Sequence, residues 1–295
     1  MDKTIEFKAD TGGITEPKGF CAAAAHSDIG GKRDSRLDIG IIYSETPCSA
    51  AGVFTKNAVK AAPVLDCQRI LDTGSDIHGV IVNSGNANAC TGTKGIRAVE
   101  KTISKAADFT NLNKNNFFVS STGIIGIQLD VNKITNNFDR LFSNLHVKNI
   151  KDFAEAIMTT DKYYKIKKSE ISIGTKKGSI IGIAKGAGMI HPNMATMLCY
   201  LLTDIKFDTK TFKNFINRAV DSTFNCISVD GEMSTNDTVL GLSNGLLGNK
   251  KINDKSPQAN KIYKSIENIF YGLSKDIVLD GEGSTKICKI IVKGA

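Results

Sequence analysis

Short apolar runs, separated by glycine, asparagine and serine, recur along most of this 295-residue chain. Apolar runs of about four to eight residues between turn residues are typical of β-strands. The pattern predicts strands at residues 37–43, 78–82, 117–121, 179–184, 197–202 and 287–292.

Three segments have the spacing of amphipathic helices, with apolar residues three or four positions apart. They are residues 96–109, residues 209–227 and a stretch around 259–273, and Asp208 is placed to cap the second. The turn-rich residues 243–261 are predicted to form a surface loop. Because the strands come in groups with helices between them, the sequence favours a layered α/β fold, an α+β sandwich, over strict alternation of strand and helix.

The composition is that of a globular protein with a sizeable core, since 41% of the residues are hydrophobic and 23% are charged. The longest apolar run, near residues 197–202, is much shorter than the roughly 20 residues that span a bilayer. Residues 1–10 are charged and lack the apolar region of a secretory signal. These features predict a soluble, cytoplasmic protein with no membrane association.

The net charge of +8 comes mostly from lysines scattered along the chain. The one dense basic run, residues 162–168, is interpreted as a solvated surface, and tryptophan is absent, so no nucleic-acid partner is expected. The seven cysteines are widely spread without a C-x-x-C pair, which is typical of reduced thiols. With four histidines and no H-x-x-x-H pair, no metal site is expected.

The most unusual segment is residues 182–204, where an apolar run enters a glycine-rich turn and a second apolar run follows Ala195 and Thr196. One interpretation is a plain hairpin with a glycine loop. The other is that Thr196, after a small residue and at the head of a buried strand, is the nucleophile of a self-processing enzyme. Cleavage before Thr196 would free its own α-amino group, whose ordinary pKa of about 7.7–8 suits a general base at neutral pH.

An acyl-transfer site also needs hydrogen-bond donors for the developing oxyanion. A Ser-Ser-Thr-Gly sequence at residues 120–123 directly follows the apolar residues 117–119, and the Thr122 hydroxyl and the Gly123 N–H are candidate donors. An ordinary Ser/Thr/Gly turn accounts for the same residues, so the pattern alone leaves both interpretations open.

Together these segments resemble the ornithine acetyltransferase family, the bifunctional glutamate N-acetyltransferase/ornithine acetyltransferases of arginine biosynthesis. The matching peptides occur in order along nearly the whole chain. They are residues 13–25 (GITEPKGFCAAAA), 51–64 (AGVFTKNAVKAAPV), 83–92 (NSGNANACTG), 121–126 (STGIIG), 158–161 (MTTD), 185–198 (KGAGMIHPNMATML), 228–238 (SVDGEMSTNDT) and 281–286 (GEGSTK).

The resemblance implies an Ntn-hydrolase-like fold of the ornithine acetyltransferase type and a precursor that cuts itself between Ala195 and Thr196. Residues 1–195 would be the α chain and residues 196–295 the β chain of one catalytic unit, assembled as a heterotetramer of two α and two β chains. The implied site comprises Thr196 as nucleophile, Thr122 and Gly123 as oxyanion hole, and Thr159, Lys185, Thr196 and Glu282 as substrate-binding residues. Whether Thr159 or the adjacent Thr160 contacts the substrate is left open.

The implied activity is transfer of an acetyl group from N2-acetylornithine to glutamate through an acetyl-Thr196 intermediate, giving ornithine and N-acetylglutamate. No metal or organic cofactor is implied, and use of acetyl-CoA as a further acetyl donor is left open. Two alternatives remain: an Ntn-type amidohydrolase or aminopeptidase, and an inactive truncated assembly subunit. The second arises because family members continue beyond residue 295 with a C-terminal tail that helps to close the pocket.

Overall fold

The computed structural model describes residues 16–31, 35–191 and 197–294. Its strands form one sheet in the order β4-β3-β2-β8-β7-β6-β5, with β1 also paired to β2. The strands are β1 (Phe20–Ala25), β2 (Ile39–Phe54), β3 (Ile77–Asn83), β4 (Phe117–Ser121), β5 (Lys165–Ile173), β6 (Lys176–Lys185), β7 (Leu198–Thr203) and β8 (Thr238–Ser243). The α-helices are α1 (Ala62–Thr73), α2 (Gly92–Thr110), α3 (Val131–Thr135), α4 (Phe138–Ser143), α5 (Ile150–Ala156), α6 (Thr209–Asp221) and α7 (Ala259–Leu279).

The long strand β2 joins two halves of this sheet. Its first part pairs with β1 and β3, and its last part, residues 49–54, pairs with β8. The register with β3 shifts between Tyr43 and Cys48, and an irregularity of this kind bends a strand. Because β2 bends, the half formed by β1–β4 can face the half formed by β5–β8.

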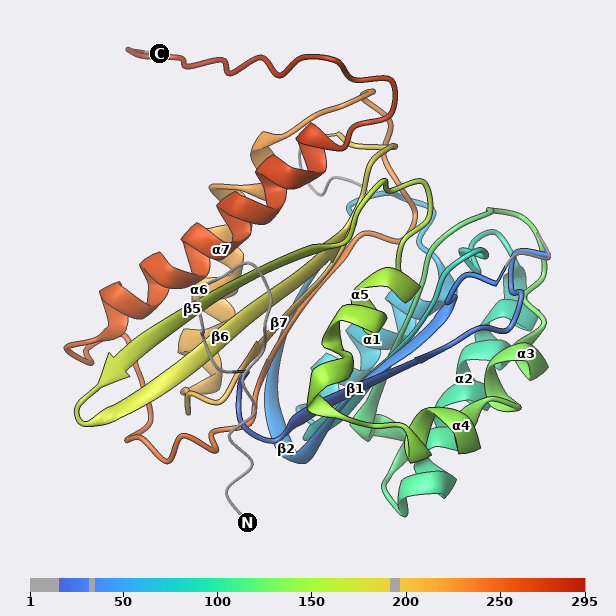
Figure 1. Ribbon diagram of the computed structural model, residues 1–295, viewed down its shortest axis with the longest axis horizontal. Coiled ribbons are helices and arrows are strands. Elements are labelled where there is room, and N and C mark those ends of the chain that lie inside the picture. Colours follow the sequence, from blue (N-terminus) through green and yellow to red (C-terminus); the bar gives the residue numbers. More distant parts are fainter. Residues whose placement is uncertain (1–15, 32–34, 192–196, 295) are drawn as a thin grey trace.

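Buried apolar side chains fill the space between the two halves. This inner core combines Ile42 and Val80 from one half with Ile183 and Tyr200 from the other, together with residues of α1 and α5. Helices α6 and α7 cover the outer face of β5–β8, and α2, α3 and α4 cover the outer face of β1–β4 (Figure 1). Two sheet halves, each covered by helices on its outer face, confirm the predicted layered α/β sandwich.

Strand β7 explains why an unbroken apolar run predicted a strand correctly. Its side chains alternate between faces, so Leu198 and Tyr200 point into the inner core while Cys199 and Leu201 pack under α6 and α7. Because both faces are buried, every position in the run is apolar. The strands predicted at 37–43, 78–82, 117–121 and 179–184 are likewise present, as parts of β2, β3, β4 and β6.

The three predicted helices are present as α2, α6 and α7, with some changes at their ends. The carboxylate of Asp208 accepts a hydrogen bond from the N–H of Thr211 at 3.1 Å, which confirms the predicted cap. Helix α6 stops at Asp221 rather than at residue 227, and a short 3-10 turn, Phe224–Cys226, follows. The predicted loop from residue 243 onward is confirmed up to the start of α7 at Ala259.

Two sequence-based predictions are wrong. Residues 287–292 form no strand; they run away from the body of the molecule (Figure 1) and pair with no described strand. The side chain of Ile290 is 82% exposed. An apolar pattern makes a strand only where a second strand pairs with its backbone. The basic run at 162–168 is not a solvated surface, because it enters β5 and Lys165 is fully buried.

Across the described ranges, no helix combines the length and the apolar character that crossing a membrane requires.

Candidate active site

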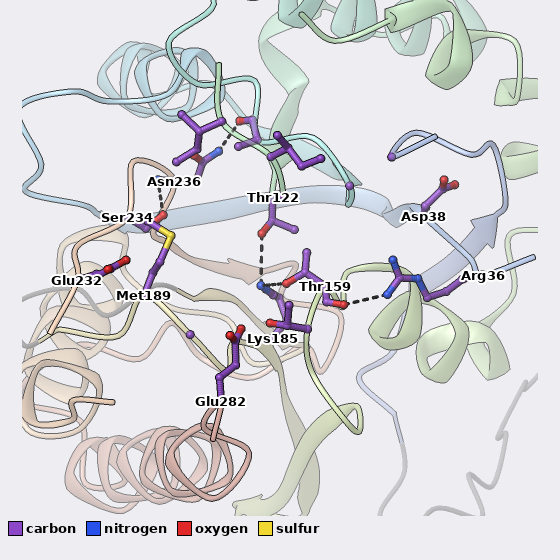
Figure 2. Close-up of a pocket in the computed structure, with 18 of the residues that line it drawn as sticks. Arg36, Asp38, Thr122, Thr159, Lys185, Met189, Glu232, Ser234, Asn236 and Glu282 are labelled. Carbon is purple, nitrogen blue, oxygen red and sulfur yellow. Dashed lines mark hydrogen bonds between the residues drawn. The ribbon is translucent and has the colours of Figure 1, made fainter. Parts of the chain in front are cut away.

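Five residues that the sequence singled out line one cavity of about 540 Å³ (Figure 2). They are Thr122, Gly123, Thr159, Lys185 and Glu282. Thr122 and Gly123 follow β4, Thr159 follows α5, Lys185 ends β6, and Glu282 follows α7. The sandwich thus brings together residues that are up to 160 positions apart in the sequence. Thr160 lines the cavity as well, so the choice between Thr159 and Thr160 as substrate contact stays open.

Lys185 lies at the centre of this group. Its Nζ is 2.6 Å from the hydroxyl oxygen of Thr159 and 3.3 Å from that of Thr122. Because an ammonium only donates, both hydroxyls accept from Lys185 and keep their own protons for donation. Burial lowers the pKa of the Lys185 ammonium, and the carboxylate of Asp161, 3.8 Å away, partly opposes that shift.

The turn after β4 presents the predicted oxyanion donors to the cavity. Gly123 has a φ of +131°, and a Cβ on it would lie 2.4 Å from the carbonyl carbon of Gly85, so only glycine fits. The N–H of Thr122 is taken by the carbonyl oxygen of Asn83 at 3.0 Å. Within the described part of the chain the N–H of Gly123 has no acceptor. The Thr122 hydroxyl and the Gly123 N–H therefore both remain able to donate.

Asp161, which lies 3.8 Å from Lys185, belongs to a buried network of charged side chains. Lys165 Nζ lies 2.8 Å from Asp161 and 2.6 Å from Asp280, and all three side chains are fully buried. Asp161 also accepts from the N–H of Gly186 at 2.7 Å. Burial alone would raise the pKa of Asp161, but Lys185 and Lys165 outweigh it and hold that pKa below its ordinary value. Two lysines and two aspartates thus neutralise one another beneath the cavity.

The same network places Glu282. Asp280 caps the C-terminus of α7, and two residues later the N–H of Glu282 donates to the carbonyl oxygen of Ala187 at 2.8 Å. The Glu282 carboxylate lies so close to Gly188 that a Cβ there would be 2.6 Å from its Oε1. The glycine-rich turn after β6 therefore leaves room for the carboxylate, which faces Lys185 across the cavity (Figure 2).

Several lining residues received no role from the sequence. Asp230 accepts from the N–H groups of Met189 and Ile190 at 2.6 and 2.8 Å and so fixes the turn on that side. Asn236 donates to the carbonyl oxygens of Ala87 and Ser121 at 2.6 and 2.8 Å and ties the start of β8 to the turn after β4. Both lie in the matched peptide 228–238, which is the signal that marks them.

Arg36 and Asp38 line the cavity at the end away from Glu232 and Ser234 (Figure 2). They lie in no matched peptide, and the sequence analysis did not predict them.

The predicted cleavage site, Ala195 and Thr196, lies outside the described residues. The next residue, Met197, donates its N–H to Asp237 at 3.2 Å. Asp237 is fully buried, and this burial raises the pKa of its carboxyl well above the ordinary value. Among the residues that the structure describes, no group of three or more His, Cys, Asp or Glu side chains is arranged to hold a metal ion.

A sequence model of the ArgJ family matches residues 22–295. The chain belongs to the ArgJ family. It is 44% identical over 280 residues to the arginine biosynthesis bifunctional protein ArgJ of Thermotoga neapolitana, and the match covers 95% of this chain and 70% of that protein. It is 42% identical over 284 residues to the protein of the same name from Symbiobacterium thermophilum, with 96% and 70% covered. The resemblance found in the sequence is confirmed.

Solved structures agree with this placement. The ArgJ structure from Bacillus halodurans superposes with a TM-score of 0.57 at 38% identity, covering 61% of this chain and 92% of that one. The ornithine acetyltransferase from Mycobacterium tuberculosis, solved with ornithine, gives a TM-score of 0.50 at 32% identity, covering 60% and 93%. A variant Ntn-hydrolase fold, the L-aminopeptidase D-Ala-esterase/amidase of Ochrobactrum anthropi, matches over 90% of this chain and 85% of that one, with a TM-score of 0.56 at 12% identity. That last likeness concerns the fold alone, and the predicted Ntn-hydrolase-like class is confirmed.

Proposed function

We propose that this protein transfers an acetyl group from N2-acetylornithine to glutamate, as an enzyme of arginine biosynthesis. Membership of the ArgJ family supports the proposal, as does 32% identity to an ornithine acetyltransferase solved with ornithine. The observation that carries it is the meeting of Thr122, Gly123, Thr159, Lys185 and Glu282 around one cavity. These side chains supply hydroxyls, a cation and a carboxylate, the groups that an acetylated amino acid requires.

In the proposed reaction Thr196, freed by self-cleavage after Ala195, attacks the acetyl carbonyl and its α-amine takes the hydroxyl proton. The Thr122 hydroxyl and the Gly123 N–H stabilise the oxyanion of the tetrahedral intermediate. The amide bond breaks, the proton passes to the departing nitrogen, and ornithine leaves. The amino group of glutamate then attacks acetyl-Thr196, and N-acetylglutamate leaves with the threonine hydroxyl restored.

Several further features belong to the same proposal. Cleavage would divide the precursor into an α chain of residues 1–195 and a β chain from Thr196, assembled as two α and two β chains in the cytoplasm. The reaction as proposed needs no metal or organic cofactor, because the nucleophile and the base lie on one residue. Acetyl-CoA would serve as a donor only if its acetyl group also reaches Thr196.

The test compares wild-type protein with Thr196→Ala and Thr196→Ser. Wild-type protein is expected to give two fragments, the smaller beginning Thr-Met-Leu-Cys-Tyr, and to exchange labelled ornithine into N2-acetylornithine. Thr196→Ala is expected to abolish both cleavage and exchange, because both use the hydroxyl, whereas Thr196→Ser retains part of each. Matched folding of the variants is checked by circular dichroism.

Other outcomes would contradict the proposal in distinct ways. Release of free acetate at the same rate with and without glutamate would indicate a hydrolase, because water would then be the acceptor. A folded wild-type chain that neither cleaves nor exchanges would indicate an inactive assembly subunit. A fully active Thr196→Ala protein would exclude Thr196 as the nucleophile.

A further inference from the structure

Two cationic side chains line the described part of the cavity, Lys185 and Arg36. They lie on either side of Thr159 (Figure 2). Lys185 Nζ is 2.6 Å from the Thr159 hydroxyl oxygen, and Arg36 Nη1 is 2.9 Å from the Thr159 carbonyl oxygen. Because both cations donate to oxygens of one residue, the distance between them can be no more than the span of Thr159 plus the lengths of the two hydrogen bonds.

The segment that carries Arg36 is anchored at Arg36 itself and at Asp38. Nδ1 of His26 lies 2.7 Å from the carbonyl oxygen of Arg36. Two residues after Arg36, the carboxylate of Asp38 accepts from the N–H groups of Ser27 and Ile29 at 2.7 and 2.6 Å. The carboxylate of Asp38 is thus engaged by its own loop, and the guanidinium of Arg36 extends toward Thr159 (Figure 2).

The proposed reaction brings two amino acids with opposite side-chain charges to one site. N2-acetylornithine ends in an ammonium and glutamate ends in a carboxylate, whereas their α-carboxylates and reacting α-nitrogens are alike. The α-groups therefore occupy the same place in both half-reactions, and the site has to accommodate the two charges at the side-chain ends. The remaining charged residues of the lining are acidic: Asp28, Asp38, Asp230, Glu232 and Glu282.

We propose that Arg36 binds the side-chain carboxylate of the acetyl acceptor while Lys185 binds its α-carboxylate. This inference rests on the proposed function. The acceptor is therefore a dicarboxylic amino acid, and the distance between its two carboxylates has to match the distance between Arg36 and Lys185. A guanidinium pairs with a carboxylate through two parallel hydrogen bonds, so Arg36 favours glutamate over its neutral amide, glutamine.

The experiment measures two exchange reactions on the full chain. One is exchange of labelled glutamate with N-acetylglutamate, and the other is exchange of labelled ornithine with N2-acetylornithine. Arg36→Gln is expected to raise the KM for glutamate about tenfold to a hundredfold, the size of a lost charge-assisted hydrogen bond, and to change the KM for ornithine far less. Arg36→Lys, which keeps the charge, is expected to fall between. Arg97→Gln, a loss of one exposed guanidinium on α2, is the matched control and leaves both KM values unchanged.

The second readout is the preference for glutamate over glutamine as acceptor, which Arg36→Gln is expected to reduce by a similar factor. Calorimetric titration with glutamate gives the same comparison for binding alone. If both KM values rise equally, Arg36 only positions Thr159 and the inference is overturned. If exchange is absent while glutamate binding still depends on Arg36, the proposed function fails and the inference stands.

Discussion

The buried lysine of β5 gives the sharpest prediction for stability. Lys165 is held between Asp161 and Asp280 at 2.8 and 2.6 Å, and none of the three side chains is exposed. Replacing Lys165 by Met keeps the length of the side chain but leaves two buried carboxylates without this partner. Removing one member of a buried ion pair destabilises a protein by about 3–5 kcal/mol. We therefore expect Lys165→Met to lower the free energy of unfolding by that amount.

The matched control lies two residues along the same strand. Lys167 pairs with Asp276 at 2.7 Å, but these side chains are 38% and 19% exposed. An exposed pair contributes about 0–1 kcal/mol, so Lys167→Met is expected to change the stability only slightly. Adding Asp280→Asn to Lys165→Met removes one of the orphaned charges and is expected to restore part of the loss.

Urea unfolding followed by circular dichroism measures all of these variants under one condition. The ammonium of Lys165 is one of the causes that lower the pKa of Lys185, after burial. Lys165→Met is therefore also expected to move the pKa of Lys185 upward, which a pH profile of glutamate binding would detect. The reasoning is refuted if Lys165→Met is no more destabilising than Lys167→Met, because the network would then not carry the buried charges described above.

Two further predictions concern the turn after β4 and the buried carboxyl beside Met197. Gly123→Ala is expected to abolish acetyl exchange and to lower the melting temperature, because the new Cβ would lie 2.4 Å from Gly85. Gly126→Ala has open space around the new Cβ, and its φ of +83° costs only about 1–2 kcal/mol of stability. Equal shifts of the melting temperature in the two variants would contradict this geometry. Burial raises the folded pKa of Asp237 above its unfolded value, so the folded state holds a proton that the unfolded state has lost, and wild-type stability falls as the pH rises from about 4. Asp237→Asn has no carboxyl to titrate, so its free energy of unfolding relative to wild type is expected to increase with pH, as measured by urea unfolding at several pH values. A difference in free energy that stays constant with pH would contradict this prediction.

The sequence predicted those parts of the fold in which local pattern and final environment agree. The strand predicted at residues 197–202 is present as β7, Leu198–Thr203, because both of its faces are buried and its neighbours β6 and β8 pair with its backbone. Residues 287–292 have a similar apolar pattern and form no strand, since no described strand pairs with them. The apolar pattern indicates which side chains are buried. A strand also requires another strand, distant in the sequence, to pair with its backbone, and the local pattern carries no information on that partner.

Strand β5 shows the reverse failure. Lysine is rarely buried without a partner, so a run of lysines indicates a surface. Lys165 has two buried partners. Asp161 lies four positions before it, but Asp280 is 115 positions further along the chain, and no local rule finds that second pair. Arg36 was not predicted as a site residue for the same reason, because its hydrogen bond to Thr159 spans 123 positions of the sequence. Thr122 and Gly123 were candidates from the local pattern, whereas Thr159, Lys185 and Glu282 came from the family resemblance alone, which summarises distant contacts that one sequence does not reveal.

The glycine-rich turn after β6 bears on the plain-hairpin interpretation that the sequence left open. Strands β6 and β7 pair antiparallel, from Lys185 opposite Leu198 to Ile180 opposite Thr203, so the segment is a hairpin. A plain hairpin, however, has no need of a glycine at position 188, where a Cβ would meet the Glu282 carboxylate at 2.6 Å. Nor does it need a buried lysine at its last paired position, since burial lowers the pKa of Lys185 and so disfavours its charge. Both features cost stability in a connection that has only to reverse the chain, and both are understandable if the turn also forms the floor of a binding cavity.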